Sequence, residues 1–277
     1  MQSVDRLGWA AGTVFAAYGL RIGVRVSDAS VLEQVRARFP YGWRSARGPE
    51  VTRLFSLRVG GKVTGSRARQ FHVVFSGFAR LYRSEDWDEA LDALESALRR
   101  EVAEHAPRHV FLHAGVVAFG GKALLIPGRS FSGKSTLVAA LVRAGATYYS
   151  DEFAVLGEDG RVRPFLKPLS LRAPGETKQA QVPVESLGGV VGRTPLEVGA
   201  VLITRHEAGS LFKPVRLSGG QLALELLNNA VAARVRPRAV MTLLHRVTRE
   251  ARGFATPRPE ASSMVPELLR LLESNGR

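Results

Sequence analysis

The sequence contains no cysteine. This absence excludes disulfide bonds, thiolate metal sites and cysteine nucleophiles, and it fits a reducing compartment. The sequence also has no uninterrupted run of about 18 apolar residues, the length that a membrane-spanning helix requires. We therefore expect a cytoplasmic protein that does not bind to membranes.

The N-terminus carries the one segment that loosely resembles a secretory signal, because Arg6 precedes a mostly apolar run over residues 7–20. Asp5 weakens the positive charge before that run. Residues 20–26 then alternate as a β-strand does. We therefore interpret the segment as the beginning of a folded domain.

Acidic residues are scarce, with 25 Asp and Glu against 39 Lys and Arg and a formal charge of +14. Such a surplus of positive charge attracts anions, among them nucleotides, acidic peptides and nucleic acids. The basic residues are scattered over 44–69 and 234–252, with no aromatic stacking platform and no helix-turn-helix pattern. We therefore do not expect nucleic acid as the partner, and the role of 234–252 stays open.

The chain of 277 residues, 45% of them apolar, is long enough for two compact parts. We predict a small α+β N-terminal domain over residues 1–106 and a catalytic domain over 107–277. Strands are expected in the first domain at 20–26, 53–59, 71–75 and 79–82, and helices at 30–38 and 86–104. In the second domain strands are expected at 110–112, 116–119, 122–126, 147–149, 154–156, 162–165 and 198–203, a helix at 135–143 and a loop over 168–195.

A phosphate-binding motif lies between a predicted strand and a predicted helix. Residues 128–135 match the pattern G-x-x-x-x-G-K-[ST] at every fixed position. In such a loop the backbone N–H groups face the phosphates, Lys134 reaches the β- and γ-phosphates, and the Ser135 hydroxyl coordinates Mg²⁺. The residues expected to contact ATP are Gly128, Arg129, Ser130, Phe131, Ser132, Gly133, Lys134, Ser135 and Thr136.

A metal-proximal carboxylate is also required, because Mg²⁺ that bridges phosphates prefers hard oxygen ligands. Asp151 follows the strand that comes after the P-loop helix. In a parallel sheet the end of that strand lies on the same edge as the P-loop. We therefore predict Asp151 and Ser135 as metal ligands and Asp151 as a catalytic residue.

Four further segments extend this pattern: Leu112 to Val116 with His113 at its second position, the Gly120-Gly121 hairpin, Tyr149 to Glu152, and Pro168 to Leu171. Together with the P-loop they resemble the HPr kinase/phosphorylase superfamily and its HPr-kinase-like relatives, some of which act on ribosomally made peptides. The resemblance covers about residues 112–171. It implies an α/β P-loop kinase domain with a twisted mixed sheet, and a homo-oligomer.

The resemblance also implies roles for single residues. His113 is expected beside the reacting groups, and Asp151 is expected as the general base near the metal. Glu152 stands where the family often has a second Asp and is expected to assist, with Lys134 on the phosphates. The glycine-rich segment of the phosphorylase type is missing, so neither the reverse reaction nor HPr itself is assigned.

These features predict an ATP-dependent serine kinase that transfers the γ-phosphoryl group to a Ser or Thr hydroxyl of a protein or peptide. A kinase of a small hydroxylated metabolite and an ATP-binding regulator without transfer stay open as alternatives. An ABC-type ATPase is a further alternative, because Leu217 to Gln221 spells the signature of that class. Ser218 and Gln221 also fit a capping box, and the Asp-Glu strand that such an ATPase needs next is missing.

Overall fold

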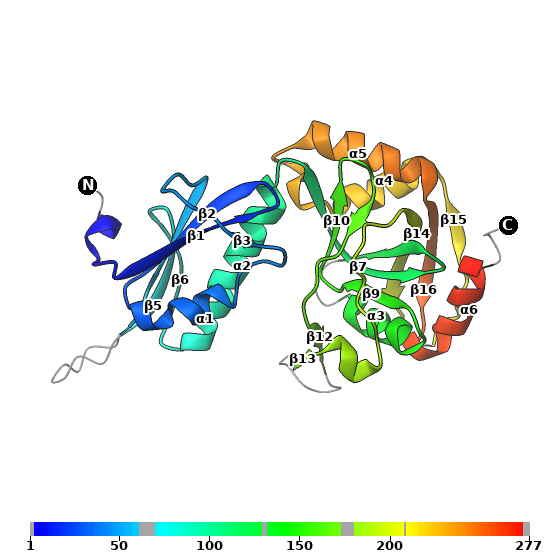
Figure 1. The fold of residues 1–277 in the computed structure, drawn as a ribbon. Helices are drawn as coiled ribbons and strands as arrows, with labels where there is room; N and C mark the ends of the chain where they lie inside the picture. Colours follow the sequence, from blue (N-terminus) through cyan, green and yellow to red (C-terminus); the bar gives the residue numbers. More distant parts are fainter. Residues whose placement is uncertain (1–2, 61–69, 129–131, 173–179, 208, 274–277) are drawn as a thin grey trace. The chain divides into compact units, whose positions relative to one another are not determined.

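The computed structural model describes residues 3–60, 70–128, 132–172, 180–207 and 209–273. The chain forms two compact units, an N-terminal unit, Met1–Arg108, and a C-terminal unit, His109–Arg277. Each unit has its own principal sheet and its own buried side chains (Figure 1). No helix in the described ranges is both long and apolar enough to cross a membrane.

The N-terminal unit contains a six-stranded sheet in the order β3-β1-β2-β4-β5-β6. Only β2 and β4 pair in parallel, and the other neighbours are antiparallel. The sequence did not predict β1, which lies inside the apolar run after Arg6. The strands are β1 (Ala11–Ala17), β2 (Leu20–Val26), β3 (Arg44–Ser45), β4 (Arg53–Arg58), β5 (His72–Ser76) and β6 (Ala79–Ser84).

The helix α2 (Trp87–His105) supplies much of the core of this unit. Asp86 caps its first turn, since the Asp86 carboxylate accepts a hydrogen bond from the Glu89 N–H at 3.0 Å. Leu94 and Leu98, one turn apart, are fully buried. The helix expected over 30–38 is shorter than predicted. The smaller helices are η1 (Ser3–Arg6), η2 (Ala29–Val31) and α1 (Leu32–Arg36).

The C-terminal unit is built on an eight-stranded mixed sheet in the order β11-β10-β7-β8-β14-β16-β15, with β9 paired to β7. The neighbours β8, β14 and β16 are parallel, and the remaining pairs are antiparallel. The strands are β7 (His109–Phe119), β8 (Lys122–Pro127), β9 (Thr147–Ser150), β10 (Phe153–Gly157), β11 (Val162–Arg163), β14 (Val198–His206), β15 (Val215–Leu217) and β16 (Arg252–Arg258).

The strand β7 is continuous, which corrects the prediction of two strands at 110–112 and 116–119. Ala114 and Gly115, which lie between the two predicted strands, both pair with β8. Gly115 is needed because a Cβ there would lie 2.6 Å from a methyl of Val138. The glycine therefore lets the helix α3 (Lys134–Arg143) pack directly onto β7.

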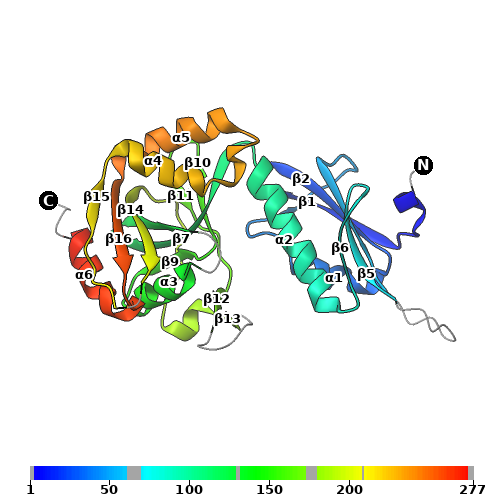
Figure 2. The same ribbon diagram turned by 180° about the vertical axis from the view of Figure 1, so that it is seen from behind.

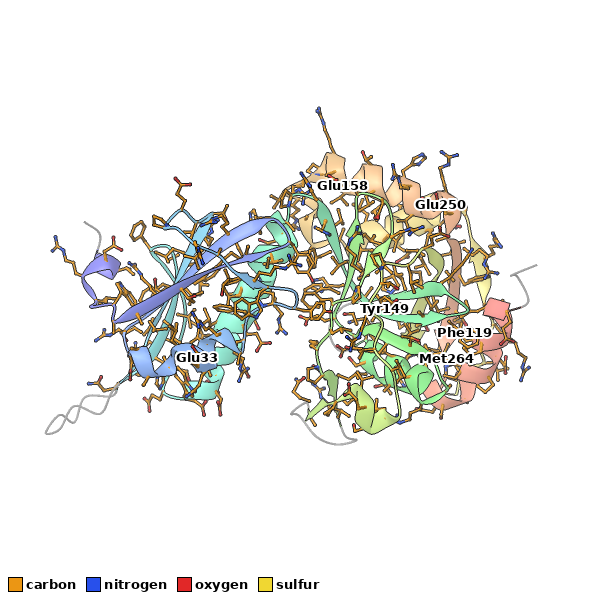
Figure 3. The ribbon with its side chains drawn as sticks, viewed as in Figure 1. Glu33, Phe119, Tyr149, Glu158, Glu250 and Met264 are labelled. Atoms are coloured by element: carbon orange, nitrogen blue, oxygen red, sulfur yellow. The ribbon has the colours of Figure 1, made fainter. Side chains whose placement is uncertain are left out.

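Helices cover both faces of this sheet (Figure 2). Each face of the sheet packs against its own hydrophobic cluster, and alternate side chains of β8 point to opposite faces. Leu125 belongs to the first cluster, and Leu124 belongs to the second. The first cluster includes α4 (Gly219–Asn228) and α5 (Pro237–Glu250), and the second includes α3 and α6 (Ala261–Glu273). Figure 3 labels Tyr149 of the first cluster and Met264 of the second.

The segment that spells the ABC signature caps a helix. The Ser218 hydroxyl accepts a hydrogen bond from the Gln221 N–H at 3.3 Å, and the Gln221 side chain accepts one from the Ser218 N–H at 2.9 Å. This capping box opens α4 and confirms the local interpretation of the segment.

The stretch over 168–195, expected as a loop, contains regular structure. Its strands β12 (Leu169–Leu171) and β13 (Ala180–Val182) form an antiparallel pair, and η3 (Val184–Leu187) follows. Residues 173–179 lie outside the described part of the chain. A further short helix, η4 (Val231–Ala233), follows α4.

Candidate functional site

The predicted phosphate loop lies between the end of β8 and the beginning of α3. Gly133 precedes the helix with a φ of 79°, a left-handed conformation that favours glycine. The first turn of α3 holds Lys134 and Ser135, both partly buried, and the exposed Thr136. The unpaired N–H groups and the positive end of a helix favour an anion at this position. Arg129, Ser130 and Phe131, also expected to contact ATP, lie outside the described residues.

Asp151 lies at the same sheet edge as this loop, for a different reason from the one predicted. The sequence argument made β9 a parallel neighbour of β8, but β7 lies between the two strands. Both are antiparallel to β7, with Pro127 paired to Ala114 and Ser150 paired to Val116. The two strands therefore run in the same direction and end at the same edge.

The Asp151 carboxylate is 3% exposed and accepts three hydrogen bonds. The Ser135 hydroxyl donates to Oδ2 at 2.9 Å, and the Ser170 N–H donates to the same oxygen at 3.0 Å. The Tyr148 hydroxyl donates to Oδ1 at 3.2 Å. Burial and the charge of Asp151 raise the pKa of Tyr148 far above its usual range, so that hydroxyl keeps its proton and stays a donor. These bonds hold the carboxylate in one orientation beside Ser135.

Lys167 joins the two acidic residues. Its Nζ lies 3.2 Å from Glu152 Oε2 and 3.8 Å from Asp151 Oδ1. Burial lowers the pKa of Lys134, the charges of Asp151 and Glu152 oppose that shift, and the charge of Lys167 adds to it. The site therefore brings two lysines and two carboxylates together beside the helix terminus.

His113 occupies the middle of β7, opposite Phe153 of β10, with the two rings 5.0 Å apart. Burial is the main cause that lowers the pKa of His113, and the positive charge of Lys134 lowers it further, while Glu152 opposes. The imidazole is therefore neutral at pH 7. Within the described residues its side chain forms no hydrogen bond with Asp151. The His113 carbonyl accepts a hydrogen bond from the Gly128 N–H at 3.0 Å, which links β7 to the predicted loop.

Arg258, the last residue of β16, is a part of this site that the sequence did not predict. It is 4% exposed, and its guanidinium donates to the carbonyls of Gly133 at 2.9 Å and Ser132 at 3.2 Å. Burial lowers its pKa, and Glu260 opposes that shift. A Cβ at Gly133 would overlap the guanidinium, so glycine is needed here for close approach as well as for φ.

Three other residues around Asp151 were missed as site residues: Tyr148, Lys167 and Ser170. The segment 168–171 was noted for its resemblance, which is the one signal that pointed toward Ser170. Nothing in the sequence marked Arg258, which lies 125 positions from Gly133. Its place in the site depends on the pairing of β16 with β14 and of β14 with β8.

The donor set fits a magnesium nucleotide. Ser135 and Asp151 offer a hydroxyl and a carboxylate, hard oxygen donors of the kind that Mg²⁺ takes in small number when phosphates supply the rest. Within the described ranges there is no group of three or more His, Cys, Asp and Glu side chains that would hold a metal alone. A metal at this edge would therefore depend on phosphate oxygens.

Comparisons with known proteins give a distant structural likeness. No protein-family model and no curated protein matches the sequence. Among solved structures, the chain is similar to the Hpr(Ser) kinase/phosphatase from Coxiella burnetii, with 14% identity and a TM-score of 0.33. The match covers 59% of this chain and 94% of that one. At these values the relation is distant.

Proposed function

We propose that this chain is an ATP-dependent kinase that transfers the γ-phosphoryl group to a Ser or Thr hydroxyl of a protein or peptide. One observation carries the proposal: the 2.9 Å hydrogen bond between Ser135, in the first turn after the glycine-rich loop, and the buried carboxylate of Asp151. In P-loop enzymes a Ser or Thr at this position and a strand-end Asp hold the magnesium of the nucleotide.

The loop residues would hold the phosphates of ATP. The N–H groups at the start of α3 and the positive end of that helix favour negative charge, and Lys134 adds a cation from the first turn. Ser135 and Asp151 would hold Mg²⁺, which when bound would neutralise charge on the phosphates. Arg258 would support the loop from behind, through the carbonyls of Ser132 and Gly133.

Asp151 would orient the acceptor hydroxyl and receive its proton. The acceptor oxygen then bonds to the γ-phosphorus as the bond from that phosphorus to the bridging oxygen of ADP breaks. The hydrogen bonds from Tyr148 and the Ser170 N–H, which fix the orientation of the carboxylate, support this role. Neutral His113 and the pair of Glu152 with Lys167 would lie beside the reacting groups and set the charge of the site.

The test is transfer of label from γ-labelled ATP to a library of Ser- and Thr-containing peptides. The wild-type protein should label peptides, and Asp151→Asn should lower the rate by about 10²–10⁴-fold. Asp159→Asn is the matched control, since Asp159 is a turn carboxylate of the same unit paired to Arg163 at 3.0 Å. It should label as the wild type does.

The other outcomes assign other functions. Label released only as phosphate would make the protein an ATPase, and ATP binding without turnover would make it a regulator. If only a small hydroxylated compound were labelled, the acceptor would be a small metabolite and not a protein or peptide. Full transfer by Asp151→Asn would show that the proposed role of Asp151 is wrong.

A further inference from the structure

The N-terminal unit has a basic cavity of about 670 Å³ that the proposed function does not use. No carboxylate is among its described lining residues, and the residues apart from three arginines are apolar, aromatic or amide side chains. The residues that matter to its chemistry are Arg58, Arg80, Arg83, Phe71, Phe75 and Phe78.

Strand register explains why the arginines gather there. Arg58 of β4 pairs with Val73 of β5, and Val73 pairs in turn with Arg83 of β6. Phe75 pairs with Arg80 in the next row. Val74, between the two rows, points the other way and is fully buried in the core. The pairing of β5 with β6 shifts by one residue between Val74 and Phe75, which brings Arg80 level with Phe75. The strand side chains of the cavity therefore share the face of the sheet that is turned away from that core.

The three arginines are exposed, and within the described residues none of them forms an ion pair or a side-chain hydrogen bond. Arg25 of β2 differs, because its guanidinium lies 2.8 Å from the Asp5 carboxylate. The Arg83 guanidinium lies over the Phe71 ring, 3.4 Å from its centroid. Stacking of this kind holds a guanidinium in place and leaves its N–H groups for an anion.

The edge of the sheet beside the cavity further indicates which class of ligand would bind there. β6 is the last strand in the order, so the N–H and C=O groups of its outer edge have no partner strand among the described residues. An extended polypeptide adds to such an edge through its backbone. Stacked nucleic-acid bases need open ring faces, and Arg83 already covers one face of Phe71. The open edge of β6 and the covered ring of Phe71 therefore favour a polypeptide as the ligand.

We infer that this cavity and the edge of β6 bind an extended acidic segment of the acceptor polypeptide. Its carboxylates would contact Arg58, Arg80 and Arg83, and its apolar side chains would contact Phe75 and Phe78. The part of the inference that makes this polypeptide the phosphoryl acceptor rests on the proposed function. The binding itself does not.

Fluorescence anisotropy of the full chain with a short labelled peptide of alternating glutamate and leucine tests the binding. The peptide should bind, and added salt should weaken the binding. The triple variant Arg58→Gln, Arg80→Gln, Arg83→Gln should lower the affinity about tenfold or more. Arg44→Gln is the matched control, because Arg44 is exposed on β3 at the opposite edge of the same sheet, and it should bind as the wild type does.

Three results would overturn the inference: no binding of the acidic peptide, equal binding of a matched lysine–leucine peptide, or unchanged affinity in the triple variant. Tighter binding of single-stranded polyuridylate would make the surface a nucleic-acid site instead. Circular dichroism checks the fold of the triple variant. If that variant fails to fold, Arg80→Gln alone should weaken binding about twofold, and unchanged affinity there would refute the inference.

Failure of this inference and failure of the proposed function give different results. If both hold, Asp151→Asn loses transfer and keeps peptide affinity, while the triple variant raises the KM for an acidic acceptor and leaves kcat unchanged. If only the inference fails, the triple variant transfers with the wild-type KM. If only the proposed function fails, peptide affinity still depends on the arginines and no variant transfers label.

Discussion

Arg258 of the C-terminal unit and the three cavity arginines of the N-terminal unit stand in opposite environments. Arg258 of the C-terminal unit is buried and donates to two backbone carbonyls. Arg58, Arg80 and Arg83 of the N-terminal unit are exposed, and no carboxylate is among the described residues that line their cavity. A buried guanidinium must have its acceptors inside the fold, because its hydration is lost. An exposed one keeps water as its partner until a ligand replaces it.

The site at Asp151 and the basic cavity therefore differ in whether their polar groups are already paired before a ligand binds. Around Asp151 the hydrogen bonds are already made, so the carboxylate is held before any ligand arrives. On the N-terminal sheet the charges are placed by strand register and by the shift in the pairing of β5 with β6. They gain binding energy only when an anion binds. We therefore expect substitutions near Asp151 to affect folding as well as activity, and substitutions in the basic cavity to affect binding only.

The largest effect on stability is expected from Arg258→Met. The substitution removes the guanidinium donor from the carbonyls of Ser132 and Gly133, and the Gly133 carbonyl keeps only the Leu137 N–H. The unfolding free energy should therefore fall by about 1–3 kcal/mol, and ATP affinity should fall with it. Arg258→Lys should recover part of both. Arg83→Met, in the exposed cavity, should change stability by no more than about 0.5 kcal/mol.

Denaturant titration can follow the two units separately. The sequence has three tryptophans, at positions 9, 43 and 87, so tryptophan fluorescence reports the N-terminal unit while far-ultraviolet circular dichroism reports both. Equal losses for Arg258→Met and Arg83→Met would contradict the contrast between buried and exposed arginines.

An intermediate effect on stability is expected from the helix N-caps, a feature that the two units share. Asp86 caps α2 and Ser218 caps α4, each through a side-chain oxygen that accepts a backbone N–H. Asp86→Ala and Ser218→Ala should each cost about 1 kcal/mol of stability, the first in the fluorescence signal and the second in circular dichroism. Neutral results for both would show that tertiary packing alone holds these helices.

The smallest effect concerns pH. Because burial lowers the pKa of His113, the folded state binds fewer protons than the unfolded state once the pH falls below the unfolded value of about 6.5. Stability should therefore decrease as the pH falls from that value toward the lowered pKa of the folded state. His109, whose pKa is also lowered, contributes in the same direction.

His113→Gln should remove part of this decrease, which unfolding titrations between neutral and mildly acidic pH would measure. His245→Gln, on the exposed side of α5, is the control and should leave the profile unchanged. A wild-type profile that rises as the pH falls would contradict the neutral state of His113.

The sequence by itself determined the local features. The Gly120-Gly121 turn, the strand-to-helix motif before Lys134, the cap at Asp86 and the capping box at Ser218 each follow from a few neighbouring residues. Their backbone conformations depend on turn and cap chemistry that short-range patterns carry. The position of Asp151 after the strand that follows the P-loop helix made it a candidate, and the resemblance added His113 and Glu152. The catalytic roles of all three remain predictions.

Only the tertiary structure decided which distant segments meet. It joined Arg258 to Gly133, surrounded Asp151 with Tyr148 and Ser170, and made β7 one strand. It also aligned three arginines of the two strands β4 and β6 beside one cavity. Strand order and register are set by packing over the whole sheet, and a shift of one residue would turn every side chain of a strand to the other face. No local pattern carries that information.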